Sequence, residues 1–296
     1  MDLQTVIYEK QDKIAFITFN RPEKYNTIKP PMTEDLEAAL QEANADNEVR
    51  VIVLQGNGKA FCAGFDFSDD LDHFEGWGGD PDAAQWDPGR DMMMVTNPFT
   101  GPVPKFMGIW RSPKPVIARI HGWCVGGGSD MALLSDIIIA SDDARIGTPY
   151  SRVWGCYLTG LWFYRLGLTK AKELALTGDW ISGKKAEEMG LINRSVPIEK
   201  LNDEVMYWAE RMAQIPVTQL AAMKLIVNQA YDNMGLQTTQ VMGSILDGYM
   251  RNTPEGLDFV ETSKREGVGA AIAKRDAPFG DYSQAPASEK PFGVPE

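Results

Sequence analysis

The feature that most constrains the fold is a repeated alternation of short apolar strands with segments of helical pattern. Residues 14–19 and 51–54 are rich in β-branched and other apolar side chains, which predicts strands buried on both faces. Residues 33–46 between them place apolar side chains at helical spacing. The pattern recurs as a strand, a helix and a strand at residues 115–120, 128–135 and 137–140. Such alternation predicts an α/β fold with parallel sheets and right-handed crossovers.

The second half of the chain changes to a succession of helices. Helical patterns are predicted at residues 169–177, 183–189, 198–214, 217–232 and 236–250. Two further segments differ in composition. Residues 69–104 are rich in Gly, Pro, Asp, Trp and Met and are too long for an ordinary connection, so we expect a functional insertion or flap. The proline-containing tail from Asp276 is expected to be extended.

Charge and composition exclude several classes of protein. The 296 residues include 29 Lys and Arg against 41 Asp and Glu, a formal charge of -12, which disfavours binding to nucleic acid. No apolar run approaches the length of a membrane span, and no signal peptide is visible at the start. Three cysteines and two histidines at unrelated spacings predict neither a disulfide framework nor a metal site. We expect a reduced, cytoplasmic protein.

Two short loops, each directly after a predicted strand, carry the strongest chemical signal. The first is Ala-Phe-Cys-Ala-Gly-Phe-Asp at residues 60–66, and the second is His-Gly-Trp-Cys-Val-Gly-Gly-Gly-Ser-Asp at residues 121–130. Ligands of parallel α/β sheets gather beyond the carboxyl ends of the strands. One backbone N–H from each loop could grip a single carbonyl oxygen, which is an oxyanion hole suited to an enolate or a tetrahedral anion.

These loops, with several other segments, resemble the crotonase superfamily, which contains the enoyl-CoA hydratases and isomerases. The other segments are Asn-Arg-Pro-Glu-Lys-Tyr-Asn at 20–26, Leu-Leu-Ser-Asp at 133–136, Leu-Thr-Gly-Asp at 176–179, Ala-Glu-Glu-Met-Gly-Leu-Ile at 186–192 and Lys-Arg-Asp-Ala-Pro-Phe at 274–279. The resemblance covers residues 6–279. It implies an α/β fold with a spiral of ββα turns in residues 1–200, a C-terminal helical region in residues 201–275 used for trimerisation, and a tail at 276–296.

The resemblance also implies a ligand and an assembly. The ligand is an acyl-coenzyme A thioester, so coenzyme A is part of the substrate and no metal or separate cofactor is expected. The implied assembly is a homotrimer or a dimer of trimers. Residue by residue, the oxyanion donors would be the backbone N–H groups of Phe65 and Gly127. Lys24, Ala63 and Phe279 match positions that contact coenzyme A.

The sequence departs from the hydratase pattern at its acid–base residues. Hydratases of this superfamily use two glutamates; the first position is matched by Asp130, whereas Tyr150 follows Gly-Thr-Pro, where the second is common. No acidic residue occurs from 145 to 168. Tyr150 could donate a proton or orient a water molecule, although it is a poor base near neutral pH. Arg152 could pin an anionic substrate group or lower the pKa of Asp130. Carboxylates in the insertion, at Asp69, Asp70, Asp72, Glu75 and Asp91, are alternative sources of the second acid.

Aromatic residues give a hint about the acyl group. They gather in or beside the insertion and the second loop, at Trp77, Trp86, Trp110, Trp123, Trp154, Tyr157, Trp162 and Phe163. Such a set could line a pocket for a bulky acyl group, with Trp123 orienting the substrate. For any single residue, a place in the core or at a subunit interface is the favoured alternative.

The resulting functional hypothesis is an enoyl-CoA hydratase or dehydratase. Asp130 would move the proton and Tyr150 would assist, while Phe65 and Gly127 polarise the thioester. Two alternatives stay open: a double-bond isomerase or a hydrolase of the same superfamily, which needs one carboxylate, and a non-catalytic acyl-CoA-binding subunit.

Overall fold

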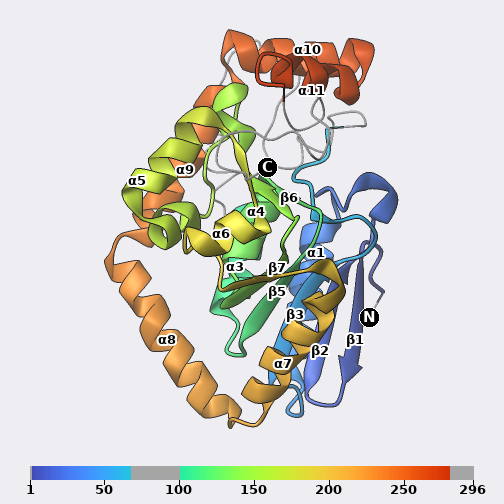
Figure 1. The fold of residues 1–296 in the computed structure, drawn as a ribbon, viewed down its shortest axis with the longest axis vertical. Coiled ribbons are helices and arrows are strands. Elements are labelled where there is room, and N and C mark those ends of the chain that lie inside the picture. The colour runs from blue at the N-terminus through green and yellow to red at the C-terminus, as the bar shows by residue number, and fades with distance from the viewer. Residues whose placement is uncertain (1, 68–100, 281–296) are drawn as a thin grey trace.

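The strands of this computed structural model form two sheets (Figure 1). The structure describes residues 2–67 and 101–280, and all statements below refer to them. The larger sheet has the order β1 (Val6–Gln11), β2 (Ile14–Phe19), β3 (Val51–Gly56), β5 (Val116–Ile120), β7 (Ile137–Ser141) and β10 (Arg194–Val196). The smaller has the order β4 (Ala60–Cys62), β6 (Trp123–Val125), β8 (Arg145–Gly147) and β9 (Trp180–Ser182).

Most neighbouring strands are parallel, which confirms the predicted α/β class. Two pairs differ from the prediction of parallel sheets: β1 runs antiparallel to β2, and β9 runs antiparallel to β8. β1 was not predicted as a strand. Only Val6 of this strand is buried, and Glu9, Lys10 and Gln11 are exposed, so its apolar signal is weak. A short turn is enough to join β1 to β2, because antiparallel strands need no crossover.

Alternate residues of the larger sheet face two different layers. Val51 and Val53 of β3 pack with α7, whereas Ile52 and Leu54 belong to the cluster that contains α1 and α3. Because successive side chains of a strand point to opposite faces, burial on both sides requires a continuous apolar run. This is the reason that apolar and polar side chains do not alternate in residues 51–54. Figure 1 shows α7 in front of the strands β2 and β3.

The helices alternate with the strands and then continue alone. They are α1 (Met32–Ala45), α3 (Pro102–Arg111), α4 (Gly127–Leu133), α5 (Leu161–Thr177), α6 (Gly183–Glu188), α7 (Leu201–Ala213), α8 (Val217–Asn233), α9 (Leu236–Arg251), α10 (Pro254–Glu266) and α11 (Val268–Asp276). Short 3-10 helices lie at η1 (Pro22–Lys24), η3 (Pro149–Arg152) and η4 (Ile198–Lys200). Among the described residues, no helix has both the length and the apolar character that crossing a membrane requires.

The predicted helices exist, with some differences at their ends. α5 begins eight residues before the predicted start and contains Gly167 in a non-helical conformation, with φ of 72°. This glycine interrupts the helical spacing of apolar side chains, so the first part of α5 was not predicted from the sequence. The expected insertion 69–104 lies mostly outside the described residues, but its last three residues form the first turn of α3. Pro102 opens that helix, a position where proline is favoured because its fixed φ suits the first turn.

Candidate active site

The sheet pairing brings the two glycine-containing loops to one edge. β4 and β6 are parallel neighbours, with Cys62 opposite Cys124. The loops leave these strands at their carboxyl ends, so Gly64 and Gly126 lie side by side. A Cβ atom at Gly64 would lie 3.0 Å from the carbonyl oxygen of Val125 and 3.7 Å from the amide nitrogen of Gly127. The loops are therefore in direct contact. The sequence placed the two segments after the strands at 51–54 and 115–120, but it did not predict β4 and β6, which lie within them.

Glycine is required in the second loop for two different reasons. Gly126 has φ of 54° and ψ of −128°, a conformation that side-chain-bearing residues rarely adopt. Gly128 lies so close to the first loop that a Cβ atom would collide with the carbonyl oxygen of Cys62. The run of glycines thus allows both the turn into α4 and the close approach of the two loops.

Backbone hydrogen bonds around Phe65 and the position of Gly127 in α4 limit the partners that the two amides can have. Ile28 donates its N–H to Gly64 O at 2.7 Å, and Asp66 donates its N–H to Ile28 O at 3.0 Å. In a parallel bridge of this kind, the N–H and C=O of the middle residue, Phe65, point away from Ile28. Gly127 is the first residue of α4, so its N–H has no acceptor one turn earlier in that helix.

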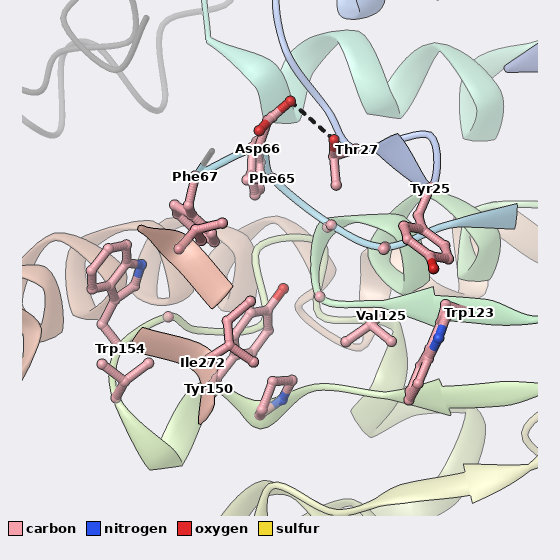
Figure 2. Close-up of a pocket in the computed structure, with 18 of the residues that line it drawn as sticks. Tyr25, Thr27, Phe65, Asp66, Phe67, Trp123, Val125, Tyr150, Trp154 and Ile272 are labelled. Carbon is pink, nitrogen blue, oxygen red and sulfur yellow. Dashed lines mark hydrogen bonds between the residues drawn. The ribbon is translucent and has the colours of Figure 1, made fainter. Parts of the chain in front are cut away.

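A cavity of about 610 Å³ opens beside these loops (Figure 2). One end, in the view of Figure 2, holds Tyr25 and Trp123, and the other holds Phe67, Trp154 and Ile272. The remaining lining residues come from η1 and the segment after it, from both loops, from η3 and the segment after it, and from the C-terminal helices. They are Glu23, Lys24, Thr27, Ala63, Gly64, Phe65, Asp66, Val125, Gly126, Gly127, Pro149, Tyr150, Val153, Gly155, Leu158, Asp247, Phe259, Val268 and Arg275.

Tyr150 lines this cavity, whereas Asp130 lies behind it. Asp130 has no exposed surface, and its Oδ2 accepts a hydrogen bond from the Tyr150 hydroxyl at 2.8 Å. Its Oδ1 accepts bonds from Thr159 Oγ1 at 2.8 Å and from the Thr159 N–H at 3.3 Å. The two residues thus form one connected unit in which the tyrosine, and not the aspartate, faces the ligand space.

Burial shifts the pKa of both members of this unit. Loss of hydration raises the pKa of Asp130 to about 6, although its hydrogen bonds from Tyr150 and Thr159 act in the opposite direction. Burial also raises the pKa of Tyr150 well above its usual range, and the negative charge of Asp130 adds to this. Asp130 therefore exchanges a proton near neutral pH, and Tyr150 stays protonated unless another group takes its proton.

The other residues singled out in the sequence divide into two groups. Lys24, Ala63 and Trp123 line the cavity. Arg152 and Phe279 do not: the Arg152 guanidinium pairs with Asp179 at 2.7 Å and with Asp276 at 3.6 Å, and the Phe279 ring lies 3.9 Å from it. Arg152 thus pairs with Asp179 and with Asp276 at the end of α11. It does not line the cavity, so it is not placed to bind an anionic group of the substrate.

The aromatic residues divide in a similar way. Trp123 and Trp154 line the cavity, whereas Trp110, Tyr157 and Trp162 are buried in the core, with Phe163 packed against it. The core interpretation is confirmed for these core residues. Trp77, Trp86 and the candidate carboxylates Asp69, Asp70, Asp72, Glu75 and Asp91 lie outside the described residues.

Asp66 shapes the first loop from its side of the cavity. Its Oδ2 accepts a bond from the Arg21 guanidinium at 2.8 Å and another from Thr27 Oγ1 at 3.0 Å, the latter drawn in Figure 2. Only 2% of Asp66 is exposed. These contacts fix the backbone that follows Phe65. Elsewhere, the described part of the chain contains no group of three or more His, Cys, Asp or Glu side chains that could hold a metal ion.

No sequence motif indicated the residues that the C-terminal helices add to the cavity. They are Asp247 of α9, Phe259 of α10, and Val268, Ile272 and Arg275 of α11. Phe259 forms edge-to-face contacts with Trp154 and Phe67, at ring-centre distances of 5.2 and 5.9 Å. The sequence pattern predicted a helix at 236–250 but not α10 and α11, and the resemblance implied only a C-terminal helical region used for trimerisation. The apolar pattern of a helix shows which side is covered, but not what it covers.

Comparison with known proteins agrees with this geometry. A family model described as enoyl-CoA hydratase/isomerase matches residues 9–280. A protein of Rhizobium meliloti (strain 1021) named "Probable enoyl-CoA hydratase" is 30% identical over 288 residues, covering 94% of this chain and 99% of that protein. The 1,2-epoxyphenylacetyl-CoA isomerase of Escherichia coli (strain K12) is 29% identical, covering 94% and 98%.

A solved structure extends the likeness to three dimensions. The crystal structure of an enoyl-CoA hydratase from Mycobacterium smegmatis superposes with a TM-score of 0.88 at 39% identity, covering 97% of this chain and 98% of that one. The family match spans the sheets, both glycine-containing loops and the C-terminal helices. On sequence and fold together, this chain belongs to the enoyl-CoA hydratase/isomerase family, within the crotonase superfamily.

Proposed function

We propose that the protein adds water to the conjugated double bond of a bulky unsaturated acyl-CoA, or removes water in the reverse direction. The observation that carries the proposal is the contact between the two loops beside the Tyr150 side chain. A Cβ atom at Gly126 would lie 3.8 Å from the Tyr150 hydroxyl oxygen and 3.9 Å from the Gly64 Cα. A thioester carbonyl held at this point would have backbone donors and a proton-transfer group around it.

The loops would stabilise the negative charge that grows on the thioester oxygen. The N–H groups of Phe65 and Gly127 donate to this oxygen as the enolate forms. Such fixed donors need no reorganisation during the reaction, and losing one typically costs about 100- to 1,000-fold in rate. Coenzyme A itself would extend past Ala63 and Lys24 at the end of the cavity that holds Tyr25 and Trp123. The ester is the substrate, and the chemistry asks for no separate cofactor.

Tyr150 would exchange a proton with the α carbon of the acyl group. Its hydroxyl donates to Asp130, so a proton that arrives at the tyrosine oxygen allows the original one to pass to the carboxylate. With a pKa of about 6, Asp130 is suited to take or return this proton. In this arrangement Tyr150 is the catalytic residue and Asp130 acts through it, which reverses the order expected from sequence.

The aromatic end of the cavity supports a bulky acyl group. Phe67 and Trp154 make an edge-to-face contact at 5.3 Å, and both contact Phe259. Ile272 adds apolar surface at this end, and Leu158 also lines the cavity. Rings in such arrangements prefer flat, apolar partners, since they offer both area and edge contacts.

Isomerisation of a double bond is the second candidate, favoured by the single Tyr150–Asp130 unit. One such unit can remove a proton at one carbon and return it at another. The Escherichia coli relative is named as an isomerase of 1,2-epoxyphenylacetyl-CoA. A hydrolase would also need only one group to activate water.

Product analysis distinguishes these functions. The purified protein is incubated with acyl-CoA esters from crotonyl-CoA to cinnamoyl-CoA, and the products are followed by mass spectrometry. Gain of one water mass supports the proposal, with faster turnover of the bulkier ester. Unchanged mass with a new retention time would indicate an isomerase, and release of free coenzyme A a hydrolase. Binding in calorimetry without any turnover would indicate a non-catalytic acyl-CoA-binding subunit.

We further propose that a second and a third copy of the chain cover α8 and α9. No residue of α8 is fully buried, although apolar side chains occur along it. Met223, Leu225 and Ile226 are each more than 60% exposed. Contiguous apolar surface of this kind is typical of subunit interfaces. Light scattering should therefore report a homotrimer or a dimer of trimers, and a monomer would contradict this part of the proposal.

A further inference from the structure

Asp247 is a carboxylate of the cavity wall that no sequence motif indicated. It lies on α9 and lines the cavity together with Tyr150. Its Oδ1 accepts a hydrogen bond from the Cys156 N–H at 3.2 Å. Gly155, the preceding residue, packs so tightly against the Tyr150 ring that a side chain there would collide with it. The Asp247 carboxylate is therefore bound to the backbone of Cys156, the residue next to the Gly155 that packs against Tyr150.

The charge of Asp247 acts on the proton-transfer unit. After burial, which is the main cause, the negative charge of Asp247 contributes to raising the pKa of Asp130 and of Tyr150. It also contributes at Cys156, where burial is again the main cause of the raised pKa. Three groups at the base of the cavity thus respond to this carboxylate, as expected for a charge at short range in a poorly hydrated space.

The carboxylate is held in place and can still bind water. Its Oδ2 accepts a bond from the Arg251 Nε at 2.9 Å, one helical turn further along α9. Each oxygen of an ionised carboxylate has more than one acceptor site, so a carboxylate that already has partners can also accept from water. The side chain is 16% exposed, in a cavity whose neighbouring wall residues include Trp154 and Phe259.

Among the described residues, three other carboxylates lie at or beside the cavity. Glu23 lines it from η1 as an exposed residue, next to Lys24 at the end assigned to coenzyme A. Asp66 is paired with Arg21 and Thr27, and it shapes the first loop. Asp130 is separated from the cavity by Tyr150 and does not line it. Hydration needs one group at the α carbon and another for the water at the β carbon. Tyr150 with Asp130 provides the first, and Asp247 is a second carboxylate of the described cavity wall.

We infer that Asp247 is the second acid–base group of the reaction and handles the proton of the water molecule. The inference rests on the hydration chemistry proposed above. In the hydration direction, ionised Asp247 takes a proton from water as the water oxygen bonds to the β carbon, and the electron pair of the carbon–carbon double bond becomes the enolate. The enolate pair then forms the C–H bond at the α carbon with the Tyr150 proton, and Tyr150 takes a proton from Asp130 in return. Exchange with solvent returns Asp130 and Asp247 to their starting states, and dehydration is the reverse of these steps.

Two reactions of matched substrates separate this role from the rest of the site. The first is dehydration of β-hydroxydihydrocinnamoyl-CoA to cinnamoyl-CoA, followed by the absorbance of the product. The second is exchange of the α protons of dihydrocinnamoyl-CoA with heavy water, followed by mass spectrometry; this ester has no group to eliminate, so it needs only the loops and Tyr150. Both are measured for the wild type, Asp247→Asn and Asp247→Glu. The control is Asp203→Asn, the same change at an exposed position of α7.

We expect Asp247→Asn to slow dehydration by about 100-fold or more while exchange stays within about threefold of the wild type. Asp247→Glu should recover part of the dehydration, and Asp203→Asn should change neither reaction. Dehydration by Asp247→Asn within threefold of the wild type would overturn the inference. Equal loss of both reactions in a folded variant would also overturn it, because Asp247 would then act on ester placement.

The same measurements keep the inference separate from the proposed function. A wild type that performs neither reaction contradicts the proposed function itself, whatever Asp247 does. If Asp247→Asn does not fold, Asp247→Ser replaces it in the same comparison with the wild type: a loss confined to dehydration supports the inference, and equal rates or an equal loss in both reactions overturns it.

Discussion

The two walls of the cavity differ in how they are built. One wall consists of the loops after β4 and β6 together with η3, where contacts are made by backbone and by a single buried tyrosine–aspartate pair. The other consists of α9, α10 and α11, which contribute one carboxylate and apolar side chains. The first wall is set by strand pairing and glycine geometry, so its positions tolerate little change. The second is made of side chains on helix surfaces, which can be exchanged without altering the fold. We therefore expect the first wall to determine whether a thioester reacts, and the second to determine which acyl group does.

Removing the Tyr150 hydroxyl from the first wall should have the largest effect on turnover. Tyr150→Phe takes away the group that faces the ligand and leaves Asp130 without its hydrogen bond from the tyrosine. Turnover of cinnamoyl-CoA should fall by about 100- to 10,000-fold, with binding of the ester changed only a few-fold. Steady-state kinetics and calorimetry measure the two quantities.

Tyr157→Phe is the matched control for this change. Tyr157 is a buried neighbour whose ring lies 5.6 Å from that of Tyr150, and its hydroxyl accepts a bond from Thr148. It does not line the cavity. If both variants lost the same activity, the loss would reflect packing and not the Tyr150 hydroxyl.

Asp130→Asn should reduce turnover by about 100-fold and should also change how stability depends on pH. The pKa of Asp130 is about 6 in the folded protein against an ordinary value of 3.8, so the folded state keeps a proton that the unfolded state has released. The associated stabilisation is present below about pH 4 and is lost as pH rises through about 6, a difference of up to about 3 kcal/mol.

Urea unfolding between about pH 4 and about pH 7 measures this effect. The free energy of unfolding of the wild type should decrease relative to that of Asp130→Asn as the pH increases. A difference between the two proteins that stayed constant with pH would show that Asp130 titrates at its ordinary pKa when folded.

Changing the second wall should affect selectivity more than rate. Phe259→Ala removes one of three mutually contacting rings. The ratio of kcat/KM for cinnamoyl-CoA to that for crotonyl-CoA should fall by about tenfold, the usual scale for losing an apolar contact in a pocket. Leu257→Ala, at an exposed position of the same helix, should leave the ratio unchanged. An equal loss for both esters would mean that this wall serves the reaction itself.

The smallest effect is expected from a substitution at the end of the cavity where coenzyme A would extend. Lys24→Ala removes a partly exposed positive charge at this end, and ester affinity should weaken by about three- to fivefold. Added salt should reduce the difference from the wild type, because it screens exposed charges. Lys13→Ala, an exposed lysine before β2, serves as the control in the same calorimetric titration. A salt-independent loss would point to packing by the lysine stem.

The first wall was largely predictable from the sequence, and the second was not. Residues 60–66 and 121–130 each follow a strand, and parallel pairing necessarily brings such loops together. The sequence could not predict that Tyr150 lines the cavity and Asp130 lies behind it, because this depends on the direction in which the buried Asp130 side chain points from α4. Asp247 lies in a helix far along the chain, and its approach to Tyr150 results from tertiary packing. Local pattern in α9 indicates an amphipathic helix and gives no information on its partner.

The ion pair between Arg152 and Asp276 connects the two walls of the cavity. Arg152 stands two positions after Tyr150 in η3, and its guanidinium reaches Asp276 at the end of α11. A displacement of α11 large enough to release a product would separate this pair and withdraw the support of the segment that carries the tyrosine. We therefore expect loss of this ion pair to loosen both the end of α11 and the segment that carries Tyr150.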